Sequence, residues 1–319
     1  MSEISVETED RRHDQDPVVK IENLTKRIGK RNIVENLSFD LYPGEIFGFL
    51  GPNGAGKTTT IRMMVGLISI SKGDVLVKGK SIKDQFEEAV IHIGAIVENP
   101  EMYKFLSGYR NLKHFARMIP GVTEERIKEV IDQVGLRKRI HDKVKTYSLG
   151  MRQRLGLAQA LLHQPSVLIL DEPTNGLDPA GIREFRDYLR KISREQGVAV
   201  MVSSHLLSEM ELMCDRVGII QKGKLIGIQS VKEMSAVSAK VQVQFTVGSA
   251  AEAKSLFNEA DHSFNQINEQ QFEILVEHEK IPEIVEQLVQ HGVSIYGIAT
   301  TSKSLEDRFL EVTGGQEIV

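Results

Sequence analysis

The sequence predicts an α/β fold with a mainly parallel sheet, a helical subdomain and a small C-terminal α+β domain. Short aliphatic runs alternate with helical patterns over residues 18–235, as is typical of parallel sheets. The strand pattern disappears between Asn99 and His163, where helical spacing takes over. From about Ala236 a shorter pattern of strands and helices begins. We therefore expect one domain over 18–235, with a helical subdomain at about 99–163, and a second domain over 236–319.

The aliphatic runs give the expected elements in chain order. In the first domain we expect strands at Val18–Ile21, Ile33–Leu41, Ile46–Leu50, Val75–Val77, Ile93–Val97, Val167–Leu170, Val198–Val202 and Val217–Ile220. Helices are expected there at Thr58–Leu67, Asn111–Met118, Glu124–Val134 and Met151–His163. In the second domain we expect strands at Val241–Val247, Phe272–Val276 and Val293–Ile298, and helices at Ala250–Asn258, Ile281–His291 and Ser304–Val312.

Composition narrows the class of protein. The chain has 319 residues, 41% of them hydrophobic, and a formal net charge of −4, which argues against nucleic acid as the main partner. Residues 1–17 are acidic and poor in apolar residues, so we expect a disordered tail. Cys214 is the only cysteine, which excludes an internal disulfide and suits a reducing cytosol. No apolar run reaches the roughly 18 residues of a membrane-spanning helix. If the protein works at a membrane, another chain would therefore have to cross it.

A phosphate-binding loop lies between a predicted strand and a predicted helix. It reads Gly51-Pro52-Asn53-Gly54-Ala55-Gly56-Lys57-Thr58, followed by Thr59, and satisfies G-x-x-x-x-G-K-[ST] in the context that confirms this motif. Its backbone N–H groups and the helix N-terminus form an anion cradle. Lys57 can reach the β- and γ-phosphates and Thr58 can bind Mg²⁺. The sequence therefore predicts that the chain binds ATP; the alternative is a glycine-rich turn with a chance lysine.

Two acids follow the buried run Val167–Leu170. Ligand-contacting residues of open α/β sheets lie at the carboxyl ends of strands, which is where Asp171 and Glu172 stand. Asp171 is placed to hold Mg²⁺, and Glu172 is placed to polarise the water that attacks the γ-phosphate. The alternative is a surface loop with two solvated acids. Together with the phosphate loop, this pair predicts ATP hydrolysis.

The ordered series of motifs resembles the nucleotide-binding subunit of an ABC transporter over about Val18–Met234. The phosphate loop is followed by Tyr147-Ser148-Leu149-Gly150-Met151, similar to the ABC signature, and then by Asp171-Glu172. Next come Asn175-Gly176-Leu177-Asp178, similar to the D-loop, and Ser203-Ser204-His205, matching the switch histidine. The resemblance implies a P-loop NTPase fold of the ABC type.

The resemblance also implies roles for residues whose local sequence is ambiguous. Ser148 and the Gly150 backbone would donate hydrogen bonds to a γ-phosphate across a head-to-tail homodimer; the alternative is an ordinary helix N-cap. His205 would contact the γ-phosphate and orient Glu172; a lone histidine at a strand end is otherwise more often structural. The partner implied is a transmembrane permease, contacted around 99–109, which would place the chain on the cytoplasmic face of the membrane.

Four residues, in three motifs, depart from the commonest family pattern. Ile28 stands where an aromatic residue usually stacks on adenine, so we expect weaker support for the base. Glu98 replaces the Q-loop glutamine; it can bind Mg²⁺ or the attacking water, or simply begin a solvated loop. Leu149 and Met151 replace a glycine and a glutamine of the signature. Glu98 and the Ser-Leu-Gly-Met form together resemble the bacitracin-type branch of ABC exporters, and the C-terminal module resembles that of ATP-binding subunits of antibiotic-resistance exporters.

Three functions compete at this level. The leading reading is an ATPase subunit that powers an exporter of a peptide antibiotic or similar toxic compound. The second is a soluble ABC ATPase acting on nucleic acid or the ribosome, although such relatives generally carry two cassettes. The third is a non-catalytic nucleotide sensor, and the presence of both Glu172 and His205 is evidence against it.

Overall fold

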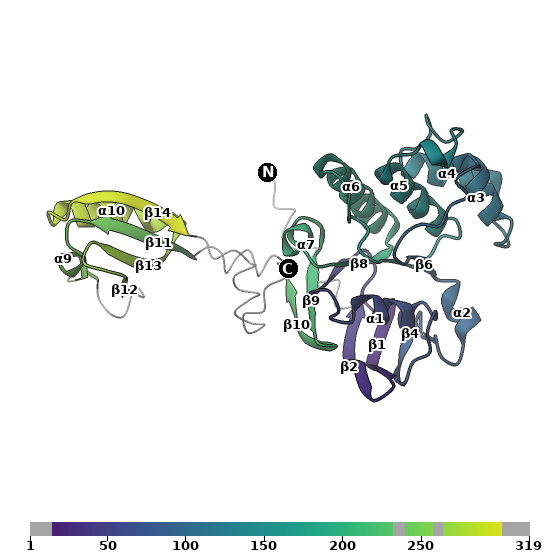
Figure 1. The fold of residues 1–319 in the computed structure, drawn as a ribbon, viewed down its shortest axis with the longest axis horizontal. Coiled ribbons are helices and arrows are strands. Elements are labelled where there is room, and N and C mark those ends of the chain that lie inside the picture. The colour runs from purple at the N-terminus through teal and green to yellow at the C-terminus, as the bar shows by residue number, and fades with distance from the viewer. Residues whose placement is uncertain (1–14, 232–239, 255, 258–263, 302–319) are drawn as a thin grey trace. The chain divides into compact units, whose positions relative to one another are not determined.

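The computed structural model describes residues 15–231, 240–254, 256–257 and 264–301. The chain divides into two compact units, with the boundary between Gln229 and Ser230 (Figure 1). Most of the acidic tail and the helix expected at Ser304–Val312 lie outside the described residues.

A six-stranded sheet forms the centre of the first unit, in the order β10-β9-β3-β8-β7-β6. Its strands are β3 (Ile46–Leu50), β6 (Ile93–Ile96), β7 (Val167–Leu170), β8 (Ala199–Ser204), β9 (Arg216–Gln221) and β10 (Lys224–Ser230). β3 pairs in parallel with β8 and β9, and β7 pairs in parallel with β6 and β8. The mainly parallel sheet is therefore confirmed, and β3 and β7 have the bounds that the sequence predicts. β10 was not predicted.

A second sheet, antiparallel and four-stranded, has the order β2-β1-β4-β5. It contains β1 (Val19–Ile28), β2 (Arg31–Leu41), β4 (Lys72–Val77) and β5 (Lys80–Ser81). The sequence predicts three of these strands but not their separate sheet. The tight turn after Ile28, which pairs with Arg31, is the local sign of an antiparallel hairpin.

One hydrophobic cluster of this unit surrounds α1 (Lys57–Met64). Phe47 and Phe49 of β3 point to the same face because side chains alternate along a strand. Both are buried and stack on Phe39 of β2, with ring centroids 5.2 and 5.5 Å apart. Ile61 and Met64 of α1 complete the cluster. The core thus holds the phosphate loop between a rigid strand and a buried helix.

Helices contact other strands of the parallel sheet. The long α6 (Pro179–Gln196) packs on β3 and β8, as does α7 (Leu207–Met213), and α5 (Leu149–Ala160) packs on β6. α3 (Gly108–Ala116), α4 (Glu124–Gln133) and α5 pack on one another and form the predicted helical insert (Figure 1). The short α2 (Phe86–Val90), α6 and α7 were not predicted.

The second unit is a small α+β module with a sheet of order β12-β13-β11-β14. Its elements are β11 (Lys240–Val247), α9 (Ala250–Lys254), β12 (Asn265–Gln266), β13 (Gln271–Glu277), α10 (Ile281–Gln290) and β14 (Ile295–Thr301). β11 pairs antiparallel with β13 and with β14. Phe245 and Phe272 stack with centroids 5.1 Å apart in a core of its own.

Candidate functional site

The phosphate loop begins at the carboxyl end of β3, whose residues are all buried. Gly51 cannot carry a side chain, because a Cβ there would lie 2.3 Å from the Ile220 carbonyl oxygen. Gly54 and Gly56 have φ angles of 78° and 111°, a region that favours glycine. Gly56 is the N-cap residue of α1. The sequence thus folds this loop into a tight turn that ends at a helix N-terminus, which is suited to an anion.

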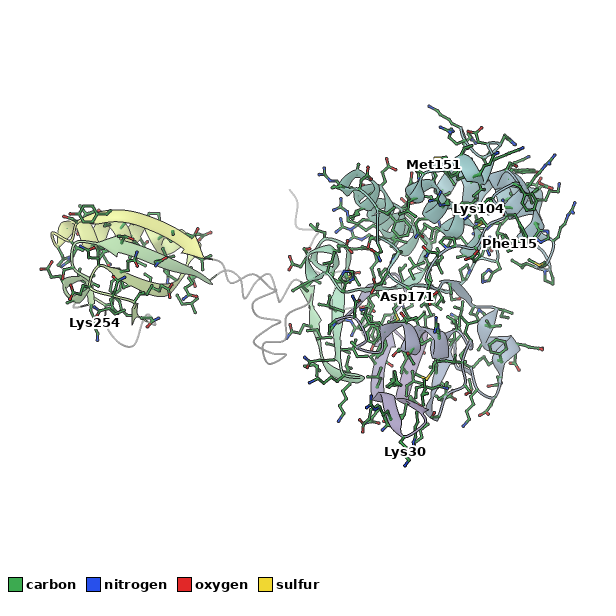
Figure 2. The ribbon with its side chains drawn as sticks, in the orientation of Figure 1. Lys30, Lys104, Phe115, Met151, Asp171 and Lys254 are labelled. Atoms are coloured by element: carbon green, nitrogen blue, oxygen red, sulfur yellow. The ribbon has the colours of Figure 1, made fainter. Side chains whose placement is uncertain are left out.

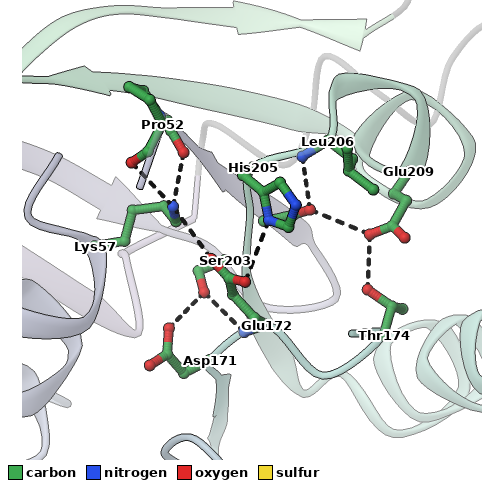
Figure 3. Close-up of polar contacts among 11 residues, drawn as sticks. Pro52, Lys57, Asp171, Glu172, Thr174, Ser203, His205, Leu206 and Glu209 are labelled. Atoms are coloured by element: carbon green, nitrogen blue, oxygen red, sulfur yellow. Dashed lines mark hydrogen bonds and ion pairs between the residues drawn. The ribbon is translucent and has the colours of Figure 1, made fainter. Parts of the chain in front are cut away.

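Lys57 is buried, and its ammonium group lies among oxygen atoms. Nζ donates to the carbonyl oxygens of Gly51, at 2.7 Å, and of Pro52, at 3.3 Å. It also lies 3.2 Å from Glu172 Oε1 (Figure 3). Since a buried charge is costly unless it is paired, these contacts explain how the loop accommodates the cation. A negatively charged phosphate oxygen would accept a stronger hydrogen bond from the Lys57 ammonium group than these backbone carbonyls do.

The predicted acids lie at the end of β7, as the sequence implied. Asp171 is 3% exposed and accepts a hydrogen bond of 2.7 Å from the Ser203 hydroxyl. The Glu172 backbone N–H donates to the same hydroxyl at 2.9 Å. Glu172 has a φ of 44°, so its backbone turns sharply after the strand. Figure 2 labels Asp171 in the interior of the first unit.

His205 contacts the second carboxylate oxygen of Glu172. Its Nδ1 lies 3.2 Å from Glu172 Oε2, while Lys57 approaches Oε1 (Figure 3). One carboxylate therefore lies between a lysine and a histidine, contributed by α1 and by the residue after β8. Leu50 pairs in register with Ser204 (β3–β8), and Leu170 pairs in register with Val202 (β7–β8). These two pairings bring Lys57, Glu172 and His205 together, although the first and last are 148 positions apart (205 − 57).

The other residues singled out in the sequence lie outside this cluster. Ser148 is the N-cap of α5, where its hydroxyl accepts from the Met151 N–H at 3.2 Å. With Gly150 it lines a cavity of about 340 Å³ shared with the Gly176–Asp178 turn, and no phosphate-loop residue lines it. Glu98 has a φ of 67° and pairs with Arg62 of α1. Ile28 ends β1 and is 58% exposed.

Sequence reasoning missed three polar residues around the cluster: Ser203 as a side-chain partner, Thr174 and Glu209. The Thr174 hydroxyl donates to Glu209 Oε2 at 2.7 Å, and the Ser204 hydroxyl donates to the same oxygen at 3.1 Å. The alternating side-chain directions at a strand end could have shown that Ser203 and Ser204 serve different neighbours. Nothing local in the sequence marks Glu209.

Comparison with known proteins decides the family. Residues 34–175 match the family model described as "ABC transporter". The ABC transporter ATP-binding protein YhcH of Bacillus subtilis is 61% identical over 93% of this chain and 96% of its own length. The chain belongs to the ABC transporter ATP-binding proteins. Its ATP-binding cassette binds ATP and hydrolyses it.

Relatives with more specific names, and solved structures, also support this family assignment. The bacitracin transport ATP-binding protein BcrA of Enterococcus faecalis is 36% identical over 93% of this chain and 97% of its own length. The solved cbiO1 of Clostridium perfringens, part of the complex cbiONQ, superimposes with a TM-score of 0.64 at 26% identity. It covers 70% of this chain and 92% of its own. The cassette fold predicted from the motifs is therefore confirmed, and so is the resemblance to the bacitracin-type branch.

Proposed function

We propose that this ABC ATPase powers a separate transmembrane permease that exports a peptide antibiotic or a similar toxic compound. The observation that carries the catalytic assignment is the single Glu172 carboxylate held between Lys57 and His205. The transport assignment rests on relatives. BcrA is named for bacitracin transport, and SrtF of Streptococcus pyogenes, 43% identical over 66% of this chain, is named for lantibiotic transport.

The catalytic residues we propose are Glu172 and His205. A γ-phosphate bound beside Lys57 competes with Glu172 for the ammonium group. Freed from Lys57, the Glu172 carboxylate can accept a proton from the attacking water. His205 keeps the carboxylate oriented through Nδ1, and a protonated His205 can donate from Nε2 to a phosphate oxygen. The triphosphate itself lies against Gly51, Pro52, Asn53, Gly54, Ala55, Gly56, Lys57, Thr58 and Thr59.

Thr58, Asp171 and Glu98 are the proposed ligands of Mg²⁺. Magnesium at nucleotide sites uses one or two carboxylates and completes its shell with phosphate oxygens and water. Among the described residues, no group of three or more His, Cys, Asp or Glu is placed to hold a metal ion by itself. Thr58, Asp171 and Glu98 would hold Mg²⁺, which would supply charge neutralisation for the phosphates. Glu98 would have to exchange its present partner, Arg62.

Ser148 and Gly150 are proposed to complete the site of a second copy in a head-to-tail homodimer. Ser148 is exposed at the N-terminus of the 12-residue α5, and its cavity is lined by none of the phosphate-loop residues of its own chain. A helix N-terminus that carries a serine hydroxyl and a glycine N–H suits a γ-phosphate. A second subunit can bring this surface to a nucleotide.

The permease is proposed to contact exposed aromatic residues that follow Glu98. Tyr103 and Phe105 are 44% and 69% exposed, and their rings pack edge to face at 5.9 Å. His114 of α3 packs edge-on against Tyr103 at 5.2 Å. Aromatic residues are enriched at interfaces. No described helix is long and apolar enough to cross a membrane, so the permease would hold the chain at the cytoplasmic face.

Co-expression with a six-helix permease encoded by a neighbouring gene tests this proposal. We expect the tagged chain to co-purify with the permease and to raise the bacitracin concentration that inhibits growth, whereas Glu172→Gln co-purifies without protecting. Phe105→Glu should lose the permease, and Leu67→Glu, at a similarly exposed position elsewhere, should keep it. Co-purification with ribosomes or nucleic acid in place of the permease would overturn the proposal in favour of a soluble ABC ATPase.

A further inference from the structure

Glu209 of α7 accepts hydrogen bonds from both sides of the catalytic cluster. Its Oε2 atom receives the Thr174 hydroxyl at 2.7 Å and the Ser204 hydroxyl at 3.1 Å. Both donors are buried, at 3% and 2% exposure. Figure 3 shows the carboxylate between the two donors. One partly buried carboxylate thus joins two segments that are 30 residues apart in the sequence (204 − 174).

Each donor stands next to a proposed catalytic residue. Thr174 follows Glu172 by two positions, in a turn closed by the Asn175 N–H donating to the Glu172 carbonyl at 3.2 Å. Ser204 immediately precedes His205, and its hydroxyl accepts from the Leu206 N–H at 3.0 Å. Both neighbours of His205 are therefore fixed through Ser204. Glu209 reaches both the Glu172 turn and the His205 segment.

The same serine also touches the phosphate loop. Its carbonyl oxygen accepts from the Gly51 N–H at 3.3 Å. Ser203, one residue earlier, binds Asp171 and the Glu172 backbone, which fixes the start of the acidic turn to β8. Glu209 fixes the continuation of that turn. Without it, Thr174 and Ser204 would be two buried hydroxyls that lack this shared acceptor, and the Glu172 turn could move relative to His205.

We propose that Glu209 is a positioning residue for ATP hydrolysis, which sets the geometry between Glu172 and His205 by accepting from Thr174 and Ser204. The inference rests on the roles proposed above for Glu172 and His205. Glu209 contacts no phosphate in this scheme, so it acts on the hydrolytic step and leaves nucleotide binding to the phosphate loop. Charge-assisted hydrogen bonds are strong and directional, which suits a residue that must hold two segments in one arrangement.

A simpler role would be stabilisation of α7, because Glu209 lies in the first turn of that helix, where a negative charge is favourable. If Glu209 acts only through its charge on α7, a substitution should change the melting temperature. If it acts as a hydrogen-bond acceptor that positions the two segments, the substitution should change kcat. A glutamine at 209 separates them, since its amide oxygen can accept both hydroxyls without a charge.

The test is steady-state ATPase kinetics of the full chain with Mg-ATP, with melting temperatures for every variant. We expect Glu209→Ala to lower kcat about tenfold or more, because small displacements of catalytic groups cost this much, with KM changed by less than about threefold. Glu209→Gln should recover most of the rate. Thr174→Val should lower kcat, and the double variant Glu209→Ala/Thr174→Val should lose less than the product of the two single losses. The matched control is Glu195→Ala, an exposed glutamate of α6.

Two outcomes would overturn the positioning role. One is a folded Glu209→Ala chain with the kcat of the wild type. The other is a Glu209→Gln chain as slow as Glu209→Ala, which would assign the effect to charge. Failure of the underlying function looks different, because Glu172→Gln would then hydrolyse ATP as fast as the wild type.

Discussion

The ammonium group of Lys57 and the carboxylate of Glu172 form a partly buried ion pair. Lys57 is 5% exposed and Glu172 is 24% exposed at the side chain. Two backbone carbonyls and one carboxylate surround the cation, and His205 approaches the far oxygen of that carboxylate. Removing one charge therefore alters the surroundings of the others. Variants at these positions separate binding from hydrolysis.

At Glu172, we expect substitution by glutamine to remove hydrolysis and to keep ATP binding. An amide cannot take a proton from water at neutral pH, so kcat should fall by about a hundredfold or more. The amide retains the shape of the carboxylate and removes a negative charge near the phosphates, so ATP affinity should stay the same or rise. Single-turnover hydrolysis and equilibrium binding of ATP measure the two effects.

The variant Lys57→Ala should instead impair ATP binding itself. It loses the cation of the phosphate loop and should weaken ATP binding by about tenfold or more, since charge-assisted contacts to phosphate are among the stronger polar interactions. If Glu172→Gln hydrolysed ATP at the rate of the wild type, the assignment of the base would be wrong.

Cys214 gives a residue-level prediction that is independent of the catalytic site. Burial raises the pKa of its thiol, and the charges of Asp215 and Glu45 add to the effect. The reactive form is the thiolate, so the folded chain should react with Ellman's reagent far more slowly at pH 8 than the urea-unfolded chain. The single cysteine makes the signal unambiguous. Fast labelling of the folded chain would contradict the buried position.

The raised pKa of Cys214 also fixes how the free energy of unfolding depends on pH. Because the pKa of Cys214 is higher in the folded chain, the folded state keeps its proton where the unfolded state loses it. The stability linked to this thiol is therefore fully present below about pH 8.5, the ordinary thiol pKa, and falls as the pH rises above it. Cys214→Ala should lose this part of the alkaline destabilisation, as measured by urea unfolding between pH 7 and 10.

At the residue scale, the loop Gly51–Thr58 and the pair Asp171-Glu172 are recognisable from neighbouring residues, whereas His205 was singled out through the family resemblance. The structure places Lys57 and His205 on the two carboxylate oxygens of Glu172. Thr174 and Glu209 escaped because their contact joins positions 35 residues apart. Such a contact depends on strand pairing, which a local pattern does not contain.

Elements have their own supporting contacts, and the C-terminal end of α5 depends on Arg126 of α4. This buried guanidinium donates to the carbonyl oxygens of Leu161, at 2.6 Å, and Leu162, at 3.3 Å. The last carbonyls of a helix lack partners within the helix, and a cation there interacts favourably with the helix dipole. Arg126 therefore supports the helix that presents Ser148 at its other end.

We expect Arg126→Ala to lower the free energy of unfolding of the first unit by about 2–3 kcal/mol, because it removes the side-chain donors to the Leu161 and Leu162 carbonyls and opens a cavity. Urea unfolding followed by circular dichroism measures the loss. Arg183→Ala, a change at a less buried position of α6, is the control and should cost less. Equal losses in the two variants would contradict the support that we assign to Arg126.

Element prediction was accurate for strands with strong aliphatic character and weaker elsewhere. Val167–Leu170 and Ile46–Leu50 were predicted with their observed bounds. The 18-residue α6 was missed although its ends carry clear signals: Asp178 caps it, Pro179 begins it, and Gly197 follows it with a φ of 68°. The separate antiparallel sheet could not be predicted from the runs alone, since a run predicts a strand but not its neighbour.

At the scale of the whole molecule, the described residues of each unit form a hydrophobic cluster of their own. Phe49 belongs to the cluster of the first unit, and Phe272 belongs to the cluster of the second. Both side chains are fully buried. Each unit therefore has the interior that an independently folding domain needs, and the proposed nucleotide-binding residues all belong to the first unit.

Scanning calorimetry of the full chain should show two transitions that respond to different changes. Phe272→Ala should lower the transition temperature of the second unit only, and Phe49→Ala should lower that of the first unit only. Each change should lower the free energy of unfolding of its unit by about 3–5 kcal/mol, as is usual for a buried phenylalanine. ATP should raise only the first transition, since a ligand stabilises the unit that binds it. Phe86→Ala, at an exposed position, is the control. A single transition lowered equally by both core variants would mean that the two cores unfold as one cooperative unit, and the accessory module would then belong to the folding of the cassette itself.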